Sequence, residues 1–170
     1  MTAEPTRGRA AVVVVSTQAA ADAALDRTGP VIADWLRERD FTVAEPVIVP
    51  DGGAITETVT AELLAGARIV ITTGGTGVTP TDRTPEAVAP LIDLELPGLL
   101  EEVRRRGLVG AGPTALLSRG IAGISSGGSL LVTLPGSRGG VADGLAVLDG
   151  LVEHVLAQVH GEGHAPRSAS

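Results

Sequence analysis

The chain has 170 residues, 44% of them hydrophobic and 19% charged, which is the composition of a globular protein. Its net charge of −7, with one Phe, one Trp and no Tyr, argues against general nucleic-acid binding. Because the chain has no Cys, disulfides, thiolate metal sites and cysteine nucleophiles are excluded. All thirteen basic residues are Arg, which excludes a Walker A lysine and a Schiff-base lysine.

The N-terminal segment, residues 1–9, is short and polar, and the apolar run after it is too short for a secretory signal or a membrane span. We therefore expect a cytoplasmic protein without membrane contact. At this length a single domain is the simplest organisation. We expect it to cover residues 10–160, with tails at residues 1–9 and 161–170.

The first part of the chain alternates between strand and helix patterns. Residues 10–15 form a continuous apolar, β-branched run, which is typical of a strand buried on both faces. After a polar connection over residues 16–28, apolar residues recur at helical spacing, at Val31, Ile32, Trp35 and Leu36. Residues 42–49 alternate and predict a second strand.

The next helix pattern follows Asp51, which stands in an N-cap position ahead of an apolar face. Residues 68–72 predict a third strand. Thr84 is then expected to cap a helix that has Pro85 at its first position.

The second half begins with a charged helix over residues 99–107. Its Arg104-Arg105-Arg106 run is either a phosphate site or a solvated helix end, and we favour the solvated helix end. Residues 115–125 and 129–134 predict a hairpin, and residues 141–159 predict the last helix. Strands that alternate with helices predict an α/β fold. We expect a three-layer αβα sandwich with a mostly parallel sheet plus an antiparallel hairpin strand.

In open α/β sheets, ligands bind at the carboxyl ends of the strands, near a switch in strand order. Four segments that directly follow predicted strands should therefore converge on one crevice: the loop from Ser16, Pro50-Asp51, residues 73–82 and residues 135–137. They contribute two carboxylates, several hydroxyls and two Gly-rich loops. This combination suits a phosphorylated ligand bound with a divalent cation.

Each of these groups also has a purely structural interpretation. Asp51 is either an N-cap or a ligand, and the sequence leaves both open. A functional role is favoured for Asp82, because Thr84 is expected to cap the helix that follows. Glu86 is interpreted as a partner of the helix dipole, and Arg119 as either a ligand contact or a surface charge at a hairpin edge. The glycines after the third strand either make a tight turn or let backbone N–H groups approach an anion.

The motif Gly74-Gly75-Thr76-Gly77, followed by residues 82–87 (Asp-Arg-Thr-Pro-Glu-Ala), resembles the signature of the Mog/MoaB family of molybdenum cofactor biosynthesis proteins. The supporting matches are Pro50-Asp51, Pro97-Gly98, Ser118-Arg119-Gly120, Leu134-Pro135-Gly136-Ser137 and Gly139-Gly140-Val141. The resemblance runs from about residue 10 to residue 159. It implies a molybdopterin-binding α/β domain, usually homotrimeric, of the kind also found in gephyrin-type fusion proteins.

The resemblance further implies an activity, in which molybdopterin and ATP give adenylyl-molybdopterin and pyrophosphate with Mg²⁺ as cofactor. Asp51 and Asp82 match the two family aspartates tied to catalysis, and we expect them to hold the metal. Nucleotide contacts are expected at Ser16 and Asp26. The residues expected to bind substrate are Thr73, Gly74, Gly75, Thr76, Gly77, Ser118, Arg119, Pro135, Gly136 and Ser137. The implied protein partners are further copies of the chain and the molybdate-insertion protein of the pathway.

The loop after the first strand departs from the family pattern, because Gln18 stands where an Arg is usual and Asp22 where a Gly is usual. If this loop touches the nucleotide, losing a cation and gaining an acid weakens ATP binding. The alternative hypothesis is therefore a non-catalytic molybdopterin carrier with the same fold. A generic nucleotide or sugar-phosphate binder is a third hypothesis.

Overall fold

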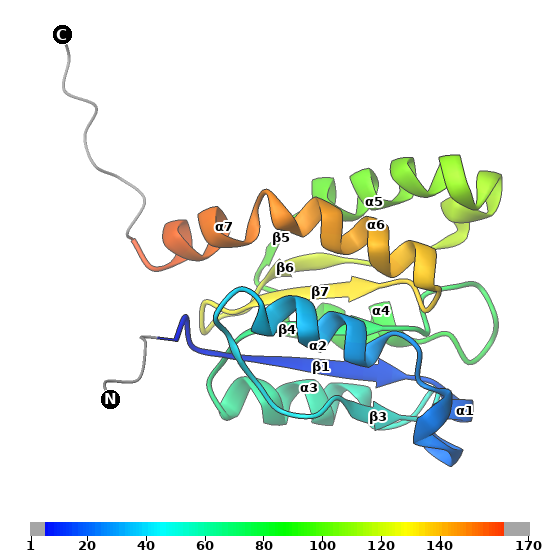
Figure 1. Cartoon of the computed structure of the whole chain (residues 1–170), viewed down its shortest axis with the longest axis horizontal. Helices are drawn as coiled ribbons and strands as arrows, with labels where there is room; N and C mark the ends of the chain where they lie inside the picture. Colours follow the sequence, from blue (N-terminus) through cyan, green and yellow to red (C-terminus); the bar gives the residue numbers. More distant parts are fainter. Residues whose placement is uncertain (1–5, 162–170) are drawn as a thin grey trace, which may run out of the picture.

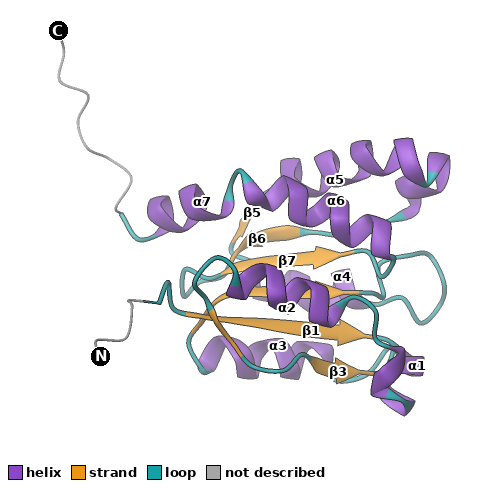
Figure 2. Ribbon diagram, viewed as in Figure 1, coloured by secondary structure: helices purple, strands orange, loops and turns teal. Residues whose placement is uncertain are grey.

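The structure, a computed structural model, describes residues 6–161, so most of both expected tails lies outside the described residues. Within this range a mostly parallel sheet lies between two layers of helices (Figures 1 and 2). The strand order is β2-β1-β4-β7-β6-β5, with β3 also beside β1, and β6 runs antiparallel to both its neighbours. The expected fold is confirmed. The strands are β1 Arg9–Val15, β2 Thr42–Val43, β3 Val47–Val49, β4 Ala67–Thr73, β5 Leu94–Glu95, β6 Ala122–Ile124 and β7 Leu130–Leu134.

The helices divide between the two faces of the sheet. One face carries α2 (Gly29–Arg37), α5 (Pro97–Gly110), α6 (Arg138–Asp149) and α7 (Val152–Val159). The other face carries α3 (Ile55–Leu64) and α4 (Thr84–Val88). The short helix α1 (Thr17–Ala21) follows β1, and three 3-10 turns complete the chain: η1 Ala23–Leu25, η2 Ala89–Leu91 and η3 Gly112–Leu117. No helix of residues 6–161 is long and apolar enough to cross a membrane.

Strand β1 shows why the sheet lies between two helical layers. Its residues 10, 12 and 14 pack into the core under α2 and α6, and residues 11, 13 and 15 pack into the core under α3. Each fully buried aliphatic side chain contributes roughly 1.5–3 kcal/mol, so an apolar residue is favoured at every position from residue 10 to residue 15.

Two expected elements are split. The strand predicted over residues 42–49 is two short strands, which pair with different parts of β1. Pro46 lies between them and has no N–H to donate to a ladder. The helix predicted over residues 141–159 begins earlier, at Arg138, and is interrupted at Gly150 and Leu151 before α7.

Three further expectations about local structure are wrong. Residues 112–117 form the turn η3, so the first hairpin strand is only β6, and the edge strand β5 has no counterpart in the predictions. Helix α5 extends to Gly110. Thr84 is the first residue of α4 and not its cap, since its hydroxyl donates to the carbonyl of Gly74 (2.8 Å).

The chain changes direction across the sheet at β1. Strands β2 and β3 lie on one side of β1, and β4 lies on the other. The carboxyl ends of β1 and β4 are therefore the switch point at which open α/β sheets place their ligands.

Candidate functional site

The glycine loop after β4 is shaped by close backbone packing. Gly74 and Gly75 have φ of +94° and +65°, which favour glycine. A Cβ on Gly74 would collide with the carbonyl of Val15, and one on Gly75 with the hydroxyl of Thr84. The tight turn thus explains these two glycines. The N–H groups of residues 75–77 donate to no acceptor within the described part of the chain, which leaves them available to an anion.

Asp82 is fixed by the loop in which it lies. Its Oδ2 accepts hydrogen bonds from the N–H (3.0 Å) and the hydroxyl (2.7 Å) of Thr79. The same oxygen lies beside Gly77, where a Cβ would stand 2.7 Å from it. Because Thr84 is not a cap, it does not make a capping role of Asp82 redundant. Asp82 itself does not cap α4, because the cap residue Arg83 has no side-chain cap bond and the carboxylate is engaged by Thr79.

Asp51 holds the start of α1. Its Oδ2 accepts from the N–H and the hydroxyl of Thr17, both at 2.9 Å. The residue before α3 is Ala54, so the interpretation of Asp51 as the cap of α3 is wrong. The two aspartate loops are neighbours, because a Cβ on Gly52 would lie 4.0 Å from the carbonyl of Thr81.

Arg119 fixes the backbone of the glycine loop through hydrogen bonds to carbonyl groups. Its Nε donates to the carbonyl of Gly77 and its Nη2 to that of Asp82, both at 2.8 Å, while Nη1 pairs with Glu86. The hydrogen bond from Arg119, followed by one from the backbone of Glu86 itself, lowers the pKa of the Glu86 carboxyl. The interpretation of Arg119 as a mere surface charge is wrong. Its contacts show a positioning role, and its contact with substrate stays a prediction.

The remaining residues expected to bind substrate are linked by hydroxyl hydrogen bonds. Thr73 donates to the carbonyl of Pro135 (2.8 Å), and the hydroxyls of Thr76 and Ser118 are 3.2 Å apart. Ser137 accepts from the N–H of Gly140 (3.1 Å) and so caps α6. The structure therefore brings β4, β7 and the segment before β6 together at one edge of the sheet. Gly136 packs close to Gly74, since a Cβ there would lie 3.1 Å from the Gly74 Cα.

The two expected nucleotide contacts, Ser16 and Asp26, both accept hydrogen bonds from backbone N–H groups at the start of a helix, and Ser16 is the N-cap of its helix. Ser16 accepts from the N–H of Ala19 (3.2 Å) at the start of α1. Asp26 accepts from the N–H groups of Thr28 (3.0 Å) and Gly29 (2.9 Å) at the start of α2. These bonds explain both residues structurally, and their contact with a nucleotide stays a prediction.

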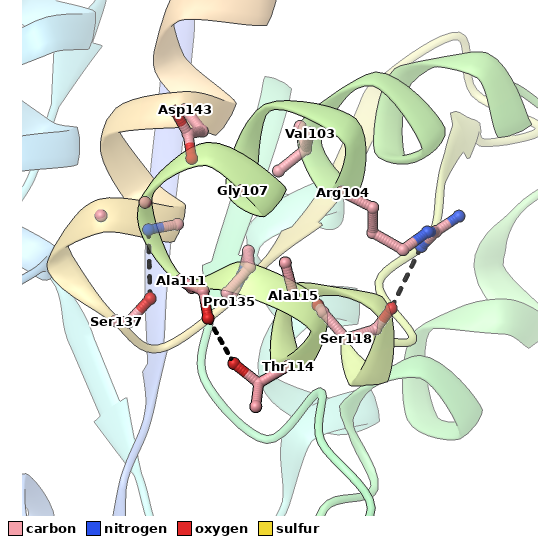
Figure 3. Close-up of a pocket in the computed structure, with 13 residues that line it drawn as sticks. Val103, Arg104, Gly107, Ala111, Thr114, Ala115, Ser118, Pro135, Ser137 and Asp143 are labelled. Carbon is pink, nitrogen blue, oxygen red and sulfur yellow. Dashed lines mark hydrogen bonds between the residues drawn. The ribbon is translucent and has the colours of Figure 1, made fainter.

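A cavity of about 520 Å³ opens beside the glycine loop, between α5, η3 and the start of α6 (Figure 3). Ser118, Pro135 and Ser137 line it, as do two charged residues that the sequence analysis missed, Arg104 and Asp143. Nη1 of Arg104 donates to the carbonyl of Ser118 (3.2 Å), as Figure 3 shows, so interpreting this residue as part of a solvated helix end is wrong. Its position four residues after the buried Leu100 was the available signal.

The two neighbours of Arg104 do behave as solvated charges. Arg105 and Arg106 both donate to Glu102, and these hydrogen bonds hold the pKa of the Glu102 carboxyl at about 2. The run of three arginines thus contains one residue that lines the cavity and two that make surface ion pairs.

The aspartates are suitable ligands for a cation that is also bound by substrate. Within residues 6–161 no group of three or more His, Cys, Asp or Glu side chains could hold a metal alone. Oδ1 of Asp51 and Oδ1 of Asp82 each accept no hydrogen bond in that range. Mg²⁺ binds through one or two carboxylates, waters and substrate phosphates, so the donor set present fits it.

Comparison with known proteins identifies the family of the chain. Residues 11–154 match the family model described as "Probable molybdopterin binding domain". The chain is 40% identical over 156 residues to the molybdenum cofactor biosynthesis bifunctional protein of Synechococcus elongatus, covering 91% of this chain and 48% of that protein. It is 33% identical to the molybdopterin adenylyltransferase of Pyrococcus furiosus, covering 85% and 87%.

The fold is also found among solved structures. The molybdopterin biosynthesis Mog protein of Mycobacterium ulcerans aligns with a TM-score of 0.83 at 44% identity, covering 89% of this chain and 98% of that one. The chain spans about half the length of the two bifunctional relatives, 48% and 50%. On the family match and these likenesses, the chain belongs to the Mog/MoaB family of molybdopterin-binding domains of molybdenum cofactor biosynthesis.

Proposed function

We propose that this chain transfers the adenylyl group of ATP to the terminal phosphate of molybdopterin, with Mg²⁺, and releases pyrophosphate. The observation that carries the proposal is that the two aspartate loops are neighbours beside the glycine loop, at the switch point of the sheet. The name of the P. furiosus relative, molybdopterin adenylyltransferase, supports the same activity.

In the proposed reaction a phosphate oxygen of molybdopterin attacks the α-phosphorus of ATP, and the bond to the pyrophosphate oxygen breaks. The free N–H groups of residues 75–77 would orient the phosphates, since they have no protein acceptor in the described part of the chain. Asp51 and Asp82 would hold Mg²⁺ through their free Oδ1 atoms. When bound, the metal neutralises charge on the oxygens of the transferring and leaving groups.

The chain's own residues would contribute by positioning the reacting groups. Thr17 and Thr79 fix the two carboxylates, and Arg119 fixes the carbonyl of Gly77 in the loop. The reaction needs no covalent enzyme intermediate, and positioning together with electrostatic stabilisation accounts for the catalysis.

The test replaces each carboxylate by an amide. We expect Asp82→Asn and Asp51→Asn to keep molybdopterin affinity and to lose turnover by about 10²–10³, the size of effect found when one charge-stabilising group is removed. Asp93→Asn, an exposed carboxylate before β5, is the matched control. Turnover of both variants equal to the control would remove the aspartates from the mechanism.

Calorimetry with ATP separates the proposal from the carrier hypothesis. Gln18 is exposed, and Asp22 accepts from the N–H of Ala24 (3.1 Å), so the acid in this loop is used as a cap of η1. ATP should therefore bind despite the altered loop. Intact molybdopterin affinity with no ATP affinity would favour the carrier.

We also propose that the chain assembles as a homotrimer. The end of α5 and the turn η3 expose several large apolar side chains, with Val109 92% and Leu116 59% exposed. Covering such a surface in a subunit contact would remove apolar area from water. Light scattering measures the mass directly, and a clear monomer would contradict the trimer.

A further inference from the structure

The cavity beside the glycine loop contains a carboxylate that has no partner. Asp143 lies in the second turn of α6 and faces α5, with its Oδ2 3.9 Å from where a Cβ of Gly107 would stand (Figure 3). Among residues 6–161 it makes no hydrogen bond and no ion pair, although Arg104 lines the same cavity. The helix dipole does not explain it either, because that effect fades beyond the first turn.

The walls of the cavity suit a flat heterocycle. They are built from small residues of three elements, including Gly107, Ala111, Ala115 and Pro135. A volume of about 520 Å³ lies within the range of small-molecule sites. The cavity adjoins the predicted phosphate site, since two of its lining residues contact that site: Ser118 pairs with Thr76, and the Pro135 carbonyl accepts from Thr73.

The charge of Asp143 decides which part of the substrates fits here. A carboxylate repels phosphate and prefers two adjacent N–H donors, which it can accept in a bidentate manner. The pyrimidine ring of a pterin offers such an edge, with N3–H beside the 2-amino group. Adenine offers one amino donor next to the acceptor N1, so its edge is the poorer match.

We propose that Asp143 is a specificity-determining residue that binds the donor edge of the pterin ring, with the ring lying in this cavity and its phosphate directed toward the glycine loop. This inference rests on the proposed function for the identity of the substrate. It adds the orientation of molybdopterin in the site and the residue that distinguishes a pterin from other bicyclic rings.

The test measures molybdopterin binding under anaerobic conditions and uses pterin and lumazine as competitors. Lumazine carries an oxygen in place of the 2-amino group and therefore lacks one of the two donors. We expect the unaltered chain to bind pterin about tenfold or more tightly than lumazine. Asp143→Asn should weaken molybdopterin binding by about tenfold or more and bring the pterin-to-lumazine ratio close to one.

Two further variants separate recognition from structure. Asp143→Glu keeps the charge and should restore preference for pterin. Glu101→Gln changes an exposed carboxylate on α5 and should leave both affinities unchanged. Circular dichroism identifies a variant that fails to fold. Should that occur, the preference of the unaltered chain still decides, since equal affinities for the two competitors overturn the proposal.

The outcome is independent of catalysis. Pyrophosphate release with no effect of Asp143→Asn on the affinity or the ratio would overturn this inference and leave the proposed function standing. Pterin selectivity that depends on Asp143, with no pyrophosphate release, would support the inference and overturn the proposed activity.

Discussion

Replacing Arg119 by Ala removes the side chain that fixes the backbone of the glycine loop. The variant loses charge-assisted hydrogen bonds to the carbonyls of Gly77 and Asp82, together with the ion pair to Glu86. Hydrogen bonds to charged groups contribute roughly 1.5–3 kcal/mol each where water is excluded. The Arg119 side chain is 37% exposed, so water replaces part of this, and we expect a loss of about 1–2 kcal/mol. For a chain of this length that corresponds to a fall in Tm of about 3–6 °C.

Urea denaturation followed by circular dichroism measures the free energy of unfolding, and calorimetry measures molybdopterin affinity, which should also fall as the loop loosens. Arg105→Ala is the matched control, because among residues 6–161 Arg105 pairs only with Glu102, on the solvated face of α5. Arg119→Lys should rescue little, since one ammonium group cannot reach three separate acceptors. The reasoning is refuted if Arg119→Ala and Arg105→Ala have the same stability and the same affinity.

Three other changes test the account through stability. Thr133→Val loses hydrogen bonds to the N–H (2.6 Å) and carbonyl (3.0 Å) of Ile121 and should cost about 1–3 kcal/mol in denaturant titrations. Thr72→Val removes a buried hydroxyl that has no partner in the described part of the chain, and it should be neutral or stabilising by about 1 kcal/mol. The reverse ranking of these two variants would contradict the hydrogen-bond assignments. The pKa of Glu86 is lowered in the folded state, so its pairing with Arg119 contributes fully to the stability of the fold above pH 4.5. This contribution is lost as the pH falls below that value. The stability difference between Glu86→Gln and the unaltered chain should therefore shrink below pH 4.5, and a difference independent of pH would be inconsistent with this pairing.

Hydrophobic patterning was enough to predict the layers of the fold. The apolar run of β1 is buried on both faces, and strands alternating with helices form the expected sheet. Element boundaries were harder to predict, because single residues decide them. Pro46 separates β2 from β3 and Gly150 interrupts the last helix, yet both segments keep their apolar periodicity.

The site was predicted at the level of loops and less well at the level of side chains. The carboxyl ends of β1, β3, β4 and β7 lie at one edge of the sheet, so the glycine loop, Asp51 and Asp82 could be placed near one another. The partners of those side chains could not, because they are distant in sequence. Thr17 lies 34 residues from Asp51, and Arg119 lies 42 residues from Gly77.

Two residues of the cavity illustrate the same limit. Arg104 was hidden within a run of three arginines, and only its spacing from Leu100 distinguishes it from the two solvated neighbours. Asp143 belongs to no recognisable motif. That its carboxylate faces a cavity follows only from the packing of α5 against α6.

The most direct measurement of the proposed activity is the product formed by the unaltered chain. Purified protein is incubated with molybdopterin, ATP and Mg²⁺, and pyrophosphate release and the mass of the pterin product are followed together. The account predicts equal amounts of pyrophosphate and adenylyl-molybdopterin, with neither formed when molybdopterin or Mg²⁺ is omitted. Bound but unmodified molybdopterin, with pyrophosphate no higher than in the absence of protein, would contradict it.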